Sequence, residues 1–178
     1  MNFFQFFQQN AKAKVLAKGD VLFHQGEACQ QLFYVQSGLL KGFYLDEQGN
    51  ESIKSFIGDN DIITSVQAVA GSGISSFSLQ ALEETHVLAI DFALIEAQRM
   101  KDLTFANELV GILLKFAMKK ERREFELLTL SAEQRFIQLA KEHAIWLDKI
   151  TQNDLARYLG ITPVGLSRIK KRVLGDHE

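Results

Sequence analysis

The sequence predicts an α+β protein in which an N-terminal antiparallel β-roll, jelly-roll-like, is followed by helices. Two observations predict this fold class. Between Val15 and Ile90, short runs of apolar residues alternate with turns that contain Gly, Asp or Asn. From Asp91 onward the apolar residues recur at helical spacing. The 178 residues suffice for one medium domain plus a small one.

Residues 1–14 are expected to form a short helix. Phe3, Phe6 and Phe7 lie at i, i+3 and i+4, so three aromatic rings share one face. Such a face must dock on another part of the protein. No basic segment followed by a long apolar run is present, which argues against a signal peptide.

About eight short strands are expected before residue 91. The clearest candidates are 21–23, 32–35, 39–45, 52–57, 77–82 and 86–90. The segment 46–50 (DEQGN) contains a Gly and predicts the turn of a hairpin between the third and fourth of these. Regular spacing of short strands favours a small antiparallel barrel or jelly roll.

A short helix capped by Asp91 and a long helix from Phe105 to about Leu128 are expected next. One apolar stripe follows the long helix: Leu109, Ile112, Leu113, Phe116 and Ala117. A helix this long with one apolar face predicts a two-helix seam between two copies of the chain. The alternative is a helix that simply lies on the barrel.

The segment 150–173 predicts a helix-turn-helix. Thr151 is a candidate cap for the first helix, and Gly160 supplies the left-handed residue that ends it. Thr162 then caps the second helix, with Pro163 in its first turn. Before this unit, another helix is expected to begin at Ser131, which has the spacing of a capping box.

The charge of the chain is uneven. Residues 1–118 carry a net charge of −5 and residues 119–178 a net charge of +3. Within 150–173 there are five cations and one acid, a concentration that favours contact with nucleic-acid phosphates. The alternative is a plain helical corner with a solvated basic face. The exposed polar face expected on the second helix favours DNA binding.

The order of these parts resembles the cyclic-AMP receptor protein / fumarate–nitrate regulator (CRP/FNR) family. The matching features are the Gly19-Asp20 and His24-to-Glu27 opening, the Tyr34-to-Gly38 turn and the Gly-Asp-Asn-Asp segment 58–61. Residues 77–91 are similar to the family's closing strands. The resemblance covers nearly the whole chain. It implies a cyclic-nucleotide-binding-like β-roll, a dimerisation helix and a C-terminal DNA-binding domain.

The resemblance also implies an effector pocket after Asp61. The candidate residues are Ile63, Thr64, Ser65, Ser75, Ser76 and Phe77. Cyclic-nucleotide-binding members have a Gly-Glu pair and an Arg at the positions that here read Thr64-Ser65 and Ser75-Ser76. Because an Arg–phosphate pair is the charge-assisted bond such a site relies on, we expect no useful affinity for cyclic AMP. No cofactor is expected, and any other small effector is not identified by the sequence.

The DNA-binding candidates come from the second helix and its cap: Thr162, Val164, Ser167, Arg168, Lys170, Lys171 and Arg172. The family's base-reading Arg-Glu pair corresponds to Pro163-Val164, whereas Arg168 matches a later Arg of the family. We expect Arg168 to contact a base or a phosphate, with Ser167 and Val164 beside it. The remaining polar candidates are expected on the phosphate side.

Members of the family usually continue into a β-hairpin wing, but only residues 174–178 follow Val173 here. Two interpretations stay open. The recognition helix binds DNA without most of a wing, or the protein is a ligand-binding or interaction module that has lost DNA binding.

Other function classes lack the residues that they need. A metal enzyme built around His24 and Glu27 would require at least three convergent ligands, but of the other histidines His143 and His177 lie in the helical C-terminal part. Cys29 is the single cysteine, which excludes a disulfide framework and argues against an iron–sulfur cluster. No apolar run is long enough to span a bilayer. We expect a non-enzymatic cytoplasmic protein.

The predicted organisation is therefore a sensor domain (1–98), a dimerisation helix (99–128) and a DNA-binding domain (129–178). The expected partners are double-stranded DNA with a pseudo-palindromic operator, a second copy of the chain and, from the resemblance, RNA polymerase. No membrane contact is expected.

Overall fold

Two four-stranded antiparallel sheets form the body of the protein. The structure is a computed structural model that describes residues 2–175. One sheet has the strand order β1-β8-β3-β6 and the other β2-β7-β4-β5. The strands are β1 (Lys12–Leu16), β2 (Val21–Phe23), β3 (Gln31–Ser37), β4 (Leu40–Leu45), β5 (Glu51–Ile57), β6 (Ile62–Ile63), β7 (Ser78–Ala81) and β8 (Thr85–Asp91). The predicted β-roll is confirmed, and the six clearest strand predictions are correct to within two residues.

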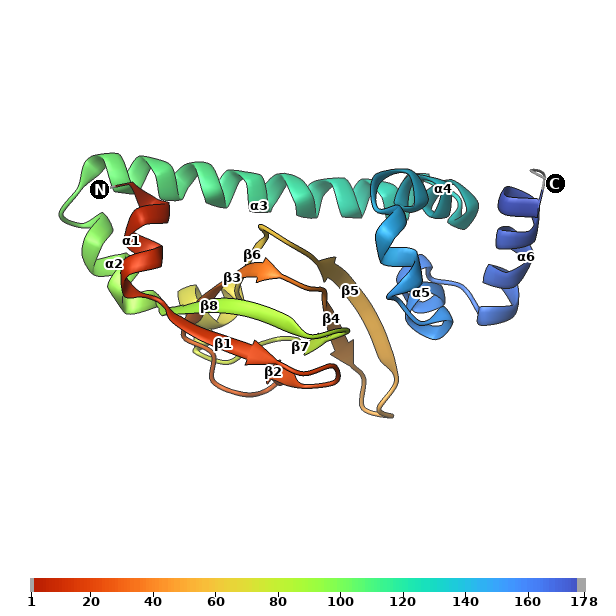
Figure 1. Cartoon of the computed structure of the whole chain (residues 1–178), viewed down its shortest axis with the longest axis horizontal. Coiled ribbons are helices and arrows are strands. Elements are labelled where there is room, and N and C mark those ends of the chain that lie inside the picture. Colours follow the sequence, from red (N-terminus) through yellow and green to blue (C-terminus); the bar gives the residue numbers. More distant parts are fainter. Residues whose placement is uncertain (1, 176–178) are drawn as a thin grey trace.

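The helices lie at both ends of the roll and along one side of it (Figure 1). They are α1 (Phe3–Asn10), a short π-helical turn η1 (Ala68–Ser72), α2 (Phe92–Arg99), α3 (Leu103–Thr129), α4 (Ala132–Glu142), a 3-10 turn η2 (Ala144–Asp148), α5 (Gln152–Leu159) and α6 (Pro163–Leu174). The long helix α3 runs from the α1–α2 end to the α4–α6 end. It therefore connects the two ends of the molecule.

The N-terminal helix is shorter than predicted. α1 ends at Asn10, and Lys12–Leu16 pairs with β8 as an edge strand of the first sheet. The expectation of a helix through residue 14 is wrong because the backbone of this segment hydrogen-bonds to a neighbouring strand that local sequence patterns do not reveal. The predicted aromatic face does dock, with the rings of Phe3 and Phe105 5.4 Å apart between centroids.

Asp91 does not cap α2 with its side chain, although it occupies the N-cap position. Its carboxylate instead accepts a hydrogen bond from the Gln31 amide at 2.9 Å. The expected cap is wrong because Asp91 is also the last residue of β8, paired with Gln31 of β3.

One apolar core joins the second sheet to the C-terminal helices. Phe43, Ile53 and Phe56 on the outer face of this sheet pack in the same cluster as Leu155 and Leu159 of α5. At its edge, Trp146 lies so close to Gly58 that a Cβ there would meet the indole at 2.8 Å. The helix-turn-helix is thus docked on the roll in this structure.

The apolar stripe predicted for α3 divides between two environments. Leu109, Ile112 and Phe116 pack on the roll or on α1 and α2, whereas Leu113 and Ala117 are exposed. The sequence predicted that the whole stripe lies in a dimer seam. This is wrong for Leu109, Ile112 and Phe116, because these residues pack against their own chain. A second stripe faces away from the roll: Val110, Leu114, Met118, Phe125 and Leu128 are all between 53% and 78% exposed.

Candidate DNA-binding surface and effector cavities

The helix-turn-helix forms as the sequence predicts. The Thr151 hydroxyl accepts a hydrogen bond from the Asp154 N–H, and the Thr162 hydroxyl accepts one from the Gly165 N–H. Gly160 adopts φ +68° and ends α5 in the left-handed conformation. These hydrogen bonds fix the residues at which α5 and α6 begin, and Gly160 fixes where α5 ends. The N-terminus of α6 therefore lies directly after the turn.

α6 packs with one face and leaves the other in solvent. Leu166 and Ile169 are buried against α4 and α5, and Val173 is partly buried with them. On the opposite face the exposed candidates are Thr162, Val164, Ser167, Arg168, Lys171 and Arg172. Lys170 is half-buried. In Figure 1, α6 lies at the far end of the molecule from α1. Its polar face is therefore open to a partner.

Two of the five cations counted in the sequence are already paired. Arg172 on α6 bonds the Glu133 carboxylate of α4, with 3.0 Å from Nε to Oε2. Arg157 on α5 reaches Glu51 on β5 at 3.0 Å. Within residues 2–175, no carboxylate lies within 4 Å of the side-chain nitrogens of Arg168, Lys170 or Lys171. These three are the cations of the unit that remain available for phosphates or bases.

Two of the four hydroxyl groups among the predicted effector residues already have hydrogen-bond partners, and the buried Ser65 hydroxyl has none among the described residues. The Thr64 hydroxyl donates to the Gln31 carbonyl at 2.8 Å, and the Ser75 hydroxyl donates to the Phe77 carbonyl at 2.8 Å. Ile63 and Phe77 belong to the core. Ser65 is fully buried, whereas Ser76 is exposed. Of the six candidates, Thr64, Ser76 and Phe77 line a cavity next to α3, here called the roll cavity.

The roll cavity also contains two lysines that sequence reasoning missed. Lys54 of β5 and Lys120 of α3 line it together with Tyr44, Val66 and Gln67. No Asp or Glu of the described residues lines it. Burial and the neighbouring charge of Lys120 lower the pKa of Lys54 to about 7. The two lysines are far apart in the sequence, so no motif spacing could have indicated that they meet.

Within residues 2–175, no group of three His, Cys, Asp or Glu side chains lies close enough together to hold a metal ion. Cys29 is buried, and desolvation raises the pKa of its thiol, which makes the thiolate scarce at neutral pH. None of the described helices is long and apolar enough to cross a bilayer.

Known proteins are similar to this chain in sequence and in fold. A family model described as a cyclic nucleotide-binding domain matches residues 13–102, half of the chain. The fumarate and nitrate reduction regulatory protein of Vibrio cholerae is 27% identical over 172 residues, covering 90% of this chain and 68% of its own length. The Escherichia coli protein of the same name is also 27% identical, over 173 residues and the same shares. The chain belongs to the CRP/FNR family of DNA-binding transcription regulators.

Solved structures of CRP/FNR regulators share the whole arrangement of roll, long helix and C-terminal helices. FixK2 from Bradyrhizobium japonicum superposes with a TM-score of 0.79 at 17% identity, over 93% of this chain and 85% of that one. A transcriptional regulator of the family from Eubacterium rectale gives 0.76 at 18% identity, over 99% and 85% of the two chains. At these identities the likeness shows the fold alone.

Proposed function

We propose that this CRP/FNR regulator acts as a dimer that places α6 of each copy in successive major grooves of a two-fold-symmetric operator. The exposed face of α6 is the observation that carries this proposal. The N-cap of α6 is formed, and the apolar side of the helix is buried. Arg168, Ser167 and Val164 face solvent, and no described residue forms an ion pair with Arg168. In a two-fold dimer, recognition helices ~34 Å apart match one turn of DNA.

The second exposed stripe of α3 supports the dimer. Val110, Leu114 and Met118 follow one another at four-residue spacing, and Phe125 and Leu128 continue the same side of the helix after an interruption at Glu121. Leaving so many large apolar side chains in contact with water on a monomer would be energetically unfavourable. The same stripe on a second copy of the chain is the partner that matches it, because a two-fold interface pairs a surface with itself.

We further propose that operator binding does not require cyclic AMP. The roll cavity offers hydroxyl and lysine side chains, but none of the described Asp, Glu or Arg residues lines it. It thus lacks the carboxylate and the guanidinium that cyclic-nucleotide-binding relatives are expected to use for the ribose and the phosphate. Contact with RNA polymerase remains a prediction from the family resemblance.

Selection of bound duplexes from a random DNA pool tests the proposal, with the purified full chain in parallel arms with and without cyclic AMP. We expect the same two-fold-symmetric sequence to be enriched in both arms, with an affinity that falls steeply with salt. No enrichment by a folded dimer in either arm would contradict the DNA-binding proposal and favour an interaction module. Enrichment only with cyclic AMP would contradict the second proposal.

A further inference from the structure

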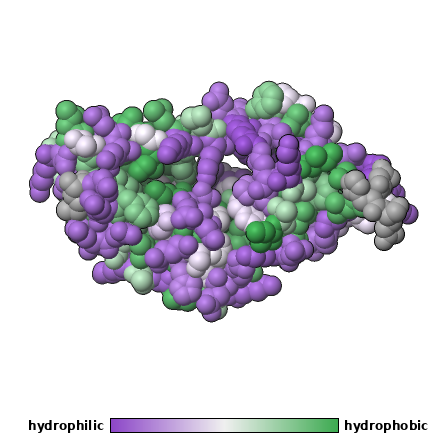
Figure 2. All heavy atoms as spheres, turned by 45° about the horizontal axis from the view of Figure 1, so that its top comes forward, coloured by the Kyte–Doolittle hydropathy of each residue, from purple (hydrophilic) through white to green (hydrophobic). Residues whose placement is uncertain are grey.

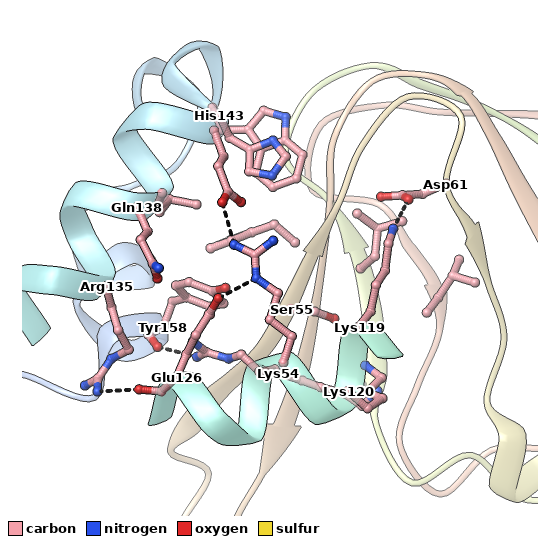
Figure 3. A pocket seen from close by; sticks show the side chains of 18 of the residues that line it. Lys54, Ser55, Asp61, Lys119, Lys120, Glu126, Arg135, Gln138, His143 and Tyr158 are labelled. Atoms are coloured by element: carbon pink, nitrogen blue, oxygen red, sulfur yellow. Dashed lines mark hydrogen bonds and ion pairs between the residues drawn. The ribbon is translucent and has the colours of Figure 1, made fainter. Parts of the chain in front are cut away.

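A second cavity lies between the roll and the DNA-binding helices. It has a volume of about 220 Å³. Figure 3 shows side chains of the roll, of α3 and of the C-terminal helices converging on it, and Figure 2 shows a hollow bordered by hydrophilic side chains. We call it the interdomain cleft; the lining residues used below are Lys54 and Ser55 of β5, Lys120 and Arg123 of α3, and Arg135 of α4.

The interdomain cleft is strongly cationic. Six Lys or Arg and three Asp or Glu line it, although the chain as a whole carries a net charge of −2. The three carboxylates are already paired, Asp61 with Lys119 and both Glu126 and Glu142 with Arg122. Lys54, Lys120 and Arg123 have no carboxylate within 4 Å among the described residues. The cleft therefore has a surplus of positive charge that the protein itself does not neutralise.

β5 contains a bulge where it lines the cleft. β4 pairs Gly42 with Ser55 and Phe43 with Ile53, so Lys54 is an extra residue that interrupts the ladder. Successive side chains of a regular strand point to opposite faces, but a bulge re-aims them. Lys54 and Ser55 both line the cleft, as do Phe56 and Ile57 after them, and Lys54 faces the like charge of Lys120.

Several donors in the cleft are buried without a partner. The Ser55 hydroxyl, Nε and Nη1 of Arg123, and Nε of Arg135 make no hydrogen bond with the described residues. Arg123 is nevertheless held in place, because its Nη2 donates to the Tyr158 carbonyl at 2.5 Å and its guanidinium lies 3.7 Å from the centre of the Tyr158 ring. Lys120 and Arg123 are three residues apart on α3 and so share one face of the helix.

We propose that the interdomain cleft binds a small, multiply charged anion of the phosphate class, held by Lys54, Lys120 and Arg123. Unpartnered N–H and O–H donors around a cationic hollow suit the several oxygens of a phosphate group. The volume admits a pyrophosphate or a small phosphorylated metabolite. Because β5, α3 and α4 all line the cleft, a ligand bound in it would stabilise the docked position of the DNA-binding helices. Binding itself does not depend on DNA recognition.

Titration calorimetry of the full chain with inorganic pyrophosphate tests this site, with inorganic phosphate as a second arm and potassium chloride at matched ionic strength as the blank. We expect saturable binding at one site per chain. Lys54→Met and Lys120→Met should each weaken it at least tenfold. Lys115→Met is the matched control, since Lys115 is exposed on α3 outside the cleft, and should bind as the wild type does. No saturable heat above the chloride blank would overturn the proposal.

Two further variants separate the interdomain cleft from the roll cavity. Ser76 lines only the roll cavity and Arg123 only the cleft. We expect Arg123→Gln to weaken pyrophosphate binding and Ser76→Ala to leave it unchanged; the reverse pattern would place the anion in the roll cavity and overturn the proposal. Thermal unfolding checks the fold. Lys54→Met removes a repulsion and should unfold no earlier than wild type without anion, while losing the rise in Tm that pyrophosphate gives the wild type.

Discussion

Lys41 Nζ lies 3.2 Å from Asp154 Oδ1, and both side chains are 92% buried. Lys41 belongs to β4 of the roll and Asp154 to α5 of the DNA-binding unit, so this ion pair joins the two parts inside their shared core. Glu51 of β5 accepts a second bond from Lys41 at 2.9 Å. Movement that separates α5 from β4 would break the Lys41–Asp154 ion pair.

Removing one member of this pair should destabilise the protein. Lys41→Met leaves the Asp154 carboxylate buried opposite a methyl group, and we expect the free energy of unfolding to fall by ~3 kcal/mol in denaturant titrations. The double variant Lys41→Met/Asp154→Leu removes both charges and should recover most of the loss. A single variant as stable as wild type would show that the junction is not held by this pair.

The exposed stripe of α3 should control the oligomeric state. Leu114→Glu puts a charge in the middle of the stripe, where it would be buried in the proposed seam, and we expect sedimentation to show monomers at concentrations at which wild type is dimeric. Leu94→Glu on α2 is the matched control, since Leu94 is also exposed but lies outside the stripe. Loss of the dimer in both variants, or in neither, would contradict this seam.

Arg168 should contribute directly to operator recognition. Arg168→Ala is expected to weaken binding to the selected operator by ~1–3 kcal/mol in fluorescence anisotropy, because an arginine that contacts base edges or phosphates contributes about that much. Arg99→Ala, at an exposed arginine of α2 that is paired with Glu96, is the control and should leave affinity unchanged. Equal affinity of the Arg168 variant and wild type would remove this residue from the interface.

Lys54 should make the stability of the protein depend on pH. Its pKa is lowered to about 7 in the folded state by burial and by Lys120, against ~10.4 in an unfolded chain. Between these values the unfolded chain binds more protons, so stability rises with pH, by up to ~1.4 kcal/mol per unit for this group. We expect the free energy of unfolding of wild type, in phosphate-free buffer, to gain on that of Lys54→Met from pH 7 to pH 9. Parallel pH profiles of the two proteins would contradict this effect.

The parts that the sequence predicts well are those fixed by neighbours along the chain. The caps of Thr151 and Thr162 and the left-handed Gly160 are local bonds and local conformations, so the helix-turn-helix follows from a short segment. The roll is also predicted from local signals, because the spacing of apolar runs and turns along the chain indicates short antiparallel strands. The edge strand at Lys12–Leu16 was missed because only its pairing with β8 makes it extended.

Features set by tertiary packing could not be predicted in this way. α3 carries apolar residues on two sides, and periodicity alone does not tell which side meets the roll of its own chain. The meeting of Lys54 with Lys120 depends on a bulge in β5 and on where α3 crosses it. The ion pair between Arg172 and Glu133 likewise depends on how α6 packs beside α4.

We expect two copies of α6 to read one operator from the major groove. Methylation interference on the selected duplex tests it most directly, because methylation at N7 of guanine blocks contacts in that groove. We expect interference in two clusters related by two-fold symmetry, with centres about 10–11 base pairs apart. A single cluster, or full binding to duplexes methylated throughout both half-sites, would contradict it.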